Sequence, residues 1–212
     1  FPQIYLLLSF IIALLSINTI LLITSMREQI KGQWPIVIQS NFLILGSSLF
    51  LLFLSQTILY HLFSATFSFF YHSFLNTLYY FLYQPRLYQP YSLEKSSYWL
   101  TFITLFCFVA ELNALSVFYN LPNQLTPLPL FILCYWFYFY LLRINKIEFE
   151  SKTEIIFTFS LILTELYFVF SFLPINFHLI GLILAGFYVI IFKLWLSKQK
   201  LTLPMAMSNQ KK

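Results

Sequence analysis

Charged residues are scarce in this sequence, and aspartate is absent altogether. Only 9% of the 212 residues are charged, and the seven acidic residues are all glutamates. A soluble domain carries about 25% charged residues, many of which cover its surface. This chain has too few for a water-facing shell, while 60% of its residues are apolar. We therefore expect an integral membrane protein whose outer face contacts lipid, and not one or two soluble domains.

Catalytic and cofactor motifs are missing as well. The chain has no HExxH metal motif, no GxSxG nucleophile motif and no glycine-rich phosphate loop. It has only four glycines, although the broken helices of many carriers need such residues at a midplane site. Two cysteines, Cys107 and Cys134, lie in apolar runs and form no zinc pattern. The sequence argues against an enzyme and specifies no cofactor.

Seven apolar runs are long enough to cross a bilayer as helices. They cover residues 3–25, 35–60, 65–83, 98–119, 126–143, 155–173 and 177–196. The second and third runs nearly merge, but one helix over 35–83 would be about 70 Å long, more than twice the hydrocarbon thickness. We therefore expect a turn near residues 61–64. Because alternation with period two is absent, we predict an all-α polytopic membrane protein: seven transmembrane helices, arranged as one helix and three helical hairpins.

The basic residues all fall on one side of this arrangement. They lie after the first, third, fifth and seventh runs: Arg27, Lys31, Arg86, Lys95, Arg143, Lys146, Lys152, Lys193, Lys198, Lys200, Lys211 and Lys212. The opposite turns, near 61–65, 120–126 and 174–177, contain none. The positive-inside rule then predicts an N-terminus outside and a C-terminus in the cytoplasm or its equivalent.

The same charge pattern defines the expected domains and location. We predict a transmembrane domain over residues 1–197 and a short basic cytoplasmic tail over 198–212. The expected location is a bacterial plasma membrane or, alternatively, an organellar inner membrane. Gly181 and Ala185, four residues apart in the last run, predict a close contact with another helix.

Glu111 and Glu165 are the strongest candidates for a functional role, because both lie well inside predicted spans. An ionisable group there is costly in lipid, so it should face the bundle interior, stay protonated or find a partner. The pair could form a proton relay or a cation site. Alternatively, the two could join helices by hydrogen bonds to Asn113, Gln56 or Asn76. We name Glu111, Glu165, Gln56 and Asn113 as the intramembrane binding candidates.

The spacing of three long polar side chains suggests an internal repeat. Gln56, Glu111 and Glu165 are 55 and 54 residues apart, each on a helix that rises from the basic side. Transporters often contain such repeats, with the binding site between the units. Any chain of similar hairpins has a period near 50 residues, however, so chance explains the spacing better than a true repeat does.

Histidines and aromatic segments give weaker signals. His61, His72 and His178 lie toward the outer ends of three helices, where they could bind a metal or haem. They lack the spacing that places two ligands from one helix at one site, and interfacial histidines commonly bond to water. The aromatic segments 67–83 and 131–142 could line a site for a flat lipophilic ligand. Packing against lipid and neighbouring helices explains them at least as well.

Three classes of function fit these features. The first is a non-enzymatic small-ligand-binding or signalling and interaction module, with a polar pocket around Glu111 and Glu165. The second is a proton- or cation-coupled carrier that uses the same glutamates, and the third is a structural subunit of a larger membrane complex. We favour the first class. The expected partners are the lipid bilayer and other membrane proteins or a second copy of the chain, and not nucleic acid, because the basic residues act as topology signals.

Overall fold

The computed structural model describes residues 2–25, 34–119, 122, 124–145 and 152–209. These residues form seven α-helices and no strand. The helices are α1 (Pro2–Ser25), α2 (Trp34–Leu52), α3 (Thr57–Tyr83), α4 (Ser92–Tyr119), α5 (Pro127–Ile144), α6 (Lys152–Ser171) and α7 (Phe177–Asn209). The predicted all-helical fold with seven helices is therefore confirmed.

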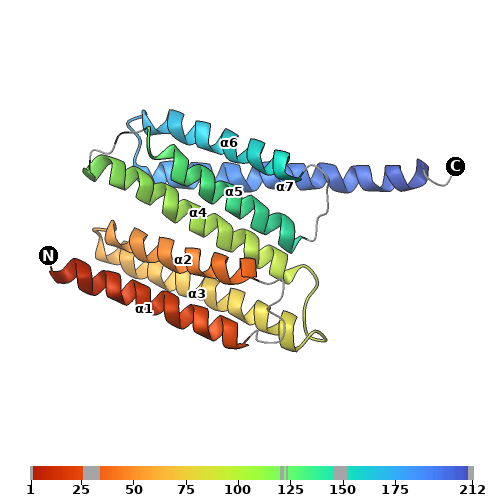
Figure 1. The fold of residues 1–212 in the computed structure, drawn as a ribbon, viewed down its shortest axis with the longest axis horizontal. Coiled ribbons are helices and arrows are strands. Elements are labelled where there is room, and N and C mark those ends of the chain that lie inside the picture. Colours follow the sequence, from red (N-terminus) through yellow and green to blue (C-terminus); the bar gives the residue numbers. More distant parts are fainter. Residues whose placement is uncertain (1, 26–33, 120–121, 123, 146–151, 210–212) are drawn as a thin grey trace.

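The helices form an up-and-down bundle around α4. Figure 1 shows α1, α2 and α3 on one side of α4 and α5, α6 and α7 on the other. Contacts of α4 with α2, α3, α5 and α7 join the two halves, and consecutive helices run in opposite directions. Short links join these antiparallel neighbours. The C-terminal ends of α3 and α5 therefore lie at the same end of the bundle as the N-terminal ends of α4 and α6.

The helices have the length and composition of membrane spans. In the described residues, five are long and apolar enough to cross a bilayer, namely α2, α4, α5, Thr153–Ser171 of α6 and Phe177–Ser197 of α7. α1 contributes a shorter apolar stretch, Ser9–Thr24. α3 is less apolar, but its 27 residues extend for about 40 Å alongside the other helices. Together these features identify a helical membrane protein.

The link between α2 and α3 lies earlier than expected. α2 ends at Leu52 and α3 begins at Thr57, so residues 61–64 are helical and the predicted turn there is wrong. The backbone N–H groups of Phe53 and Leu54 bond to carbonyls three residues back, which tightens and ends the last turn of α2. Gln56 then adopts an extended conformation before α3. The break contains no proline or glycine, and only the short polar segment 55–57 marks it in the sequence.

The last helix is longer than expected. The predicted seventh span ends at residue 196, whereas α7 continues to Asn209. Figure 1 shows this part of α7 extending beyond the ends of the other helices. The segment predicted as a basic tail therefore continues the helix through most of its length.

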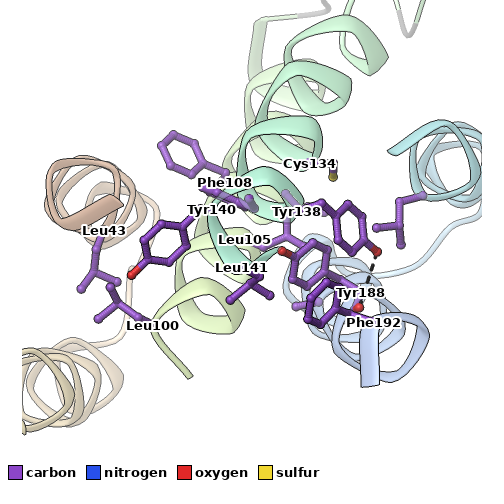
Figure 2. Packing of buried hydrophobic residues seen from close by; sticks show 14 of the residues in the cluster. Leu43, Leu100, Leu105, Phe108, Cys134, Tyr138, Tyr140, Leu141, Tyr188 and Phe192 are labelled. Atoms are coloured by element: carbon purple, nitrogen blue, oxygen red, sulfur yellow. Dashed lines mark hydrogen bonds between the residues drawn. The ribbon is translucent and has the colours of Figure 1, made fainter. Parts of the chain in front are cut away.

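An aromatic and leucine-rich core joins α2, α4, α5 and α7 (Figure 2). Tyr138 of α5 and Tyr188 of α7 are almost fully buried, with ring centroids 4.3 Å apart. The Tyr138 hydroxyl lies 3.5 Å from the Tyr188 carbonyl oxygen. The Tyr140 hydroxyl shares a hydrogen bond of 3.1 Å with Ser97 of α4. Buried aromatic rings thus supply apolar area while their hydroxyls fix neighbouring helices in register.

α4 and α7 approach closely at Gly181. A Cβ atom at this position would lie 2.9 Å from the carbonyl oxygen of Phe106 in α4 and 3.3 Å from the Cβ of Ala110. Ala185, one turn later, is fully buried. The close helix contact predicted from this small-residue pair is confirmed, and it brings the two longest helices together.

Candidate functional site

Glu111 is buried between α4 and α2. Its side chain is 3% exposed, and its carboxyl group interacts with the backbone of Phe50 near the end of α2. The carboxyl oxygen Oε1 has no hydrogen-bond partner in the described residues. A buried polar atom left unpaired costs free energy, so the α2–α4 contact here is held by packing more than by polar bonds.

The other three candidates do not gather around Glu111. Asn113, 5% exposed, donates its amide hydrogen to the Val109 carbonyl of its own helix at 3.0 Å. Glu165 is exposed on the outer face of α6. Gln56 is exposed in the link before α3, and so is not a member of a rising helix. The fold therefore encloses Glu111 but not Glu165, and the two carboxyl groups share no buried pocket.

The histidines are also distributed over separate places. His61 and His72 are exposed on α3, and eleven residues of helix separate them by about 16 Å. His178 is partly buried at the start of α7, with its ring 5.4 Å from that of Phe50. Metal ligands lie about 2 Å from the ion, so His61 and His72 cannot share one. The described residues contain no group of three or more His, Cys, Asp or Glu side chains able to hold a metal.

A polar cluster that the sequence interpretation missed joins α1, α2 and α3. The Asn18 side-chain amide donates to the Ser40 hydroxyl at 3.1 Å and to the side-chain oxygen Oδ1 of Asn41 at 2.7 Å. The Asn41 amide in turn donates to Thr19 at 2.8 Å. The Tyr71 hydroxyl of α3 donates to Asn18 and lies 3.2 Å from the Ser40 hydroxyl. We call these five residues the Asn18 cluster; such interhelical bonds stabilise helix contacts in a bilayer.

A lateral pocket opens beside the Asn18 cluster. It has a volume of about 650 Å³ and lies between α1 and α3, with Ile44 of α2 also at its wall. The polar atoms at its surface come from Asn18 and three tyrosines of α3, whereas the rest of the lining is aliphatic. Its lining residues are Leu14, Ile17, Asn18, Leu21, Leu22, Ile44, Tyr71, Leu75, Leu78, Tyr79, Leu82 and Tyr83. A pocket of this kind suits the chain of a lipid or another apolar molecule.

Polar side chains form an outward-facing line along α3. His61, Ser68, His72 and Asn76 are all exposed. Their spacings of seven, four and four residues place them on one side of the helix. Phe74 and Leu78, the buried residues of α3, lie on the opposite side. We call the four polar residues the α3 stripe.

The side-chain amide of Gln39, like the carboxyl oxygen Oε1 of Glu111, is buried without a hydrogen-bond partner in the described residues. Gln39 of α2 is fully buried, and neither polar atom of its side chain has a hydrogen-bond partner in the described residues. Leu43, one turn further along the same face, packs near Leu100 and Tyr140 in Figure 2. A glutamine within an apolar run was the available signal for this position, and our sequence interpretation did not use it.

Comparisons with known proteins supply no family for the chain. No protein-family model matches it, and neither does a curated protein or a solved structure. Its function must therefore be inferred from the arrangement of its own residues.

Proposed function

We propose that the protein is a non-enzymatic interaction module, a multi-pass subunit that packs against other membrane proteins through the α3 stripe. The observation that supports this proposal is that the polar side chains of the α3 stripe are exposed on the outside of the bundle. It favours the structural-subunit class over a carrier or a sensor with an enclosed glutamate pocket.

The position of the stripe along α3 is central to the argument. α3 covers Thr57–Tyr83, so Ser68 and His72 lie around the middle of the helix, whereas Asn76 lies nearer its basic end. At that depth a side chain cannot reach the watery headgroup region as easily as it can from a helix end. Facing lipid, an imidazole or an amide would lose its hydrogen bonds to water without replacement.

Contact with another protein removes this cost. Serine, asparagine and histidine in membrane helices hydrogen-bond across helix interfaces, where small and polar residues are enriched. The α3 stripe has this composition, with Ala65 exposed among its polar members. A partner helix that offers hydrogen-bonding side chains along this face would satisfy the stripe and cover α3.

Glu165 gives independent support on the other side of the bundle. It is exposed on α6 among apolar neighbours, of which Leu161 is 41% exposed and Val169 is 58% exposed. α3 and α6 lie on opposite sides of α4 in Figure 1. Intramembrane acids are rarely left in contact with lipid. The protein would then lie between neighbours, as a subunit inside an assembly does.

The carrier alternative receives less support. A coupled carrier needs its proton- or cation-binding groups at a site that substrate also reaches. Glu111 is 3% exposed, between α4 and α2, and Glu165 is exposed on α6, so the pair offers no shared site.

The experiment is photo-crosslinking within the native membrane. A photoreactive amino acid at position 72, on the stripe, should form covalent adducts with protein. The same group at Ile132, an apolar position of α5 that is 60% exposed, should react mainly with lipid. Equal protein adducts at both positions, or none at position 72, would overturn the proposal.

A variant pair tests the stripe energetically. His72→Leu combined with Asn76→Leu should release the chain from the assembly seen after mild detergent extraction and native electrophoresis. Ser16→Leu on α1 is the matched control, because Ser16 is exposed and its hydroxyl bonds only to the Ile12 carbonyl of its own helix. If the double variant stays assembled, or if the unmodified chain migrates alone near its mass of 25.3 kDa, the subunit proposal fails.

A further inference from the structure

A groove between α4 and α7 opens to the outside near the basic end of the bundle. Its volume is about 660 Å³, and it is separate from the α3 stripe and from the pocket beside α1. Its lining combines aromatic and aliphatic side chains with several polar and charged ones. The lining residues are Tyr91, Glu94, Lys95, Tyr98, Trp99, Phe102, Asn145, Gly186, Val189, Ile190, Lys193 and Leu196.

A second, apolar hollow adjoins the groove. This second hollow has a volume of about 230 Å³ and shares Trp99 and Phe102 with the first. One wall of this hollow comes from α3 and the other from α4, with Leu182 of α7 at its edge, and apart from Thr66 its lining residues are apolar or aromatic. The two hollows thus form one trough along α4, charged at one end and apolar at the other. We call it the α4–α7 trough.

Gly186 borders the trough on α7. A Cβ atom built on Gly186 would meet no other atom within 4 Å, in contrast to Gly181, whose Cβ would press on the α4 backbone. Gly186 therefore lies on a different side of α7 from Gly181, and Ala185 and Phe192, on the Gly181 side, remain fully buried. The open space beside the glycine belongs to the trough and is not used for packing within the chain.

The charged end of the trough carries a net positive charge. Lys95 and Lys193 line it together with one carboxylate, that of Glu94. The Tyr88 hydroxyl lies 3.3 Å from Glu94 Oε2 and donates to it. That carboxylate is therefore already engaged by the chain, whereas both lysine side chains are exposed and form no ion pair with another described residue.

We infer that the α4–α7 trough binds an anionic phospholipid, with its phosphate between Lys95 and Lys193 and an acyl chain along Trp99 and Phe102 toward Leu182. A water-soluble anion has no apolar chain to fill the apolar hollow. A zwitterionic lipid brings no net negative charge to the two lysines. Volumes of about 300–1,000 Å³ are usual for small-molecule sites, and basic residues at a membrane surface attract anionic lipids.

Trp99 provides a direct probe, because it lines both parts of the trough. The full chain with Trp34→Phe, Trp136→Phe and Trp195→Phe retains Trp99 as its only tryptophan. It is reconstituted in phosphatidylcholine bilayers that contain either brominated phosphatidylglycerol or brominated phosphatidylcholine, whose bromines quench tryptophan fluorescence. At equal mole fraction, brominated phosphatidylglycerol should occupy the site preferentially, by about fivefold for each lysine that contacts the headgroup.

Three variants separate a specific site from general surface attraction. Lys95→Gln with Lys193→Gln should abolish the preference for phosphatidylglycerol. Arg143→Gln, which removes an exposed charge at the same end of the bundle but outside the trough, should leave it unchanged. Gly186→Leu should reduce quenching by either brominated lipid, because the added side chain occupies the open space.

The outcomes decide the inference in either direction. Equal quenching by the two lipids, or a preference that survives loss of both lysines, overturns it. A preference that Arg143→Gln weakens as much as the lysine changes also overturns it, since the basic end as a whole would then be responsible. If the lysine variant fails to fold, as judged by circular dichroism, Gly186→Leu alone decides: unchanged quenching rejects the trough as the site.

Discussion

Two glycines on α7 have opposite surroundings, and this difference can be measured. Gly181 faces the α4 backbone at a distance that admits no side chain, whereas Gly186 faces open space. A glycine in a helix costs about 0.5–1 kcal/mol relative to alanine, so it persists where packing requires it. At Gly181 the requirement is contact between helices.

We predict that Gly181→Ala destabilises the bundle by about 1–3 kcal/mol, because α4 and α7 must move apart to admit the methyl group. Gly186→Ala should cause no loss, since its new Cβ meets no atom within 4 Å. Thermal unfolding of the two variants in the same detergent makes the comparison. Equal midpoints for the two variants would contradict the close contact at Gly181.

The sequence indicates how deep in the bilayer a residue lies, but it does not indicate whether its side chain faces the core of the bundle or the outside. Glu111 and Glu165 both fall well inside apolar runs, yet one is buried and the other is exposed. α6 carries apolar residues on every side, so its sequence does not indicate which side faces the core. Only the contacts of α5 and α7 with α6 determine that Glu165 points outward.

Among the elements, α1 is attached in an unusual way. Its main helix contact is with α2, and a lateral pocket lies between α1 and α3. The Asn18 cluster bridges all three helices at this place. Apolar packing adds little to association in a bilayer, because lipid tails are as apolar as leucine, so the polar bonds matter more here.

We predict that Asn18→Leu weakens the docking of α1 by about 1–3 kcal/mol, because it removes bonds to Ser40, Asn41 and Tyr71 at once. Ser16→Ala, on the same helix, removes only a bond to the Ile12 carbonyl and should have almost no effect. Thermal unfolding in nanodiscs measures both. A stable Asn18→Leu variant would show that packing alone holds α1.

Helix existence was easier to predict than helix boundaries. The runs at 3–25 and 126–143 correspond closely to α1 and α5, because polar or proline-containing segments flank them. The link between α2 and α3 was misplaced because only Ser55, Gln56 and Thr57 interrupt a long apolar stretch there, with no proline or glycine in the break. The Asn18 cluster was missed for another reason: its short polar side chains come from three different runs, and one sequence does not tell which of them meet.

At the scale of the whole molecule, charge is concentrated at one end. Arg86 follows α3, Lys95 lies in the first turns of α4, and Arg143 lies in the last turn of α5. These positions share one end of the bundle in Figure 1. The links at the opposite end, near residues 53–56 and 172–176, contain no lysine or arginine. From the positive-inside rule we propose that the basic end faces the cytoplasm or its equivalent.

We predict that Gln89→Cys and Gln124→Cys react with a membrane-impermeant thiol reagent from opposite sides of the membrane. Both positions are exposed, one in the link after α3 and the other in the turn before α5. The natural cysteines, Cys107 and Cys134, are buried and should give a low background. Labelling of both variants from one side would refute the seven-span arrangement, and labelling with the sides exchanged would refute its orientation.

The exposed polar line on α3 has a consequence for how the protein is maintained in a cell. If the protein is the subunit that we propose, a newly inserted copy without neighbours would present His72 to acyl chains at a cost in free energy, and proteases degrade less stable proteins faster. Its lifetime would then be set by the supply of partner subunits. Cells that make too little of the partner would degrade the surplus, and the abundance of this chain would follow that of its assembly instead of its own rate of synthesis.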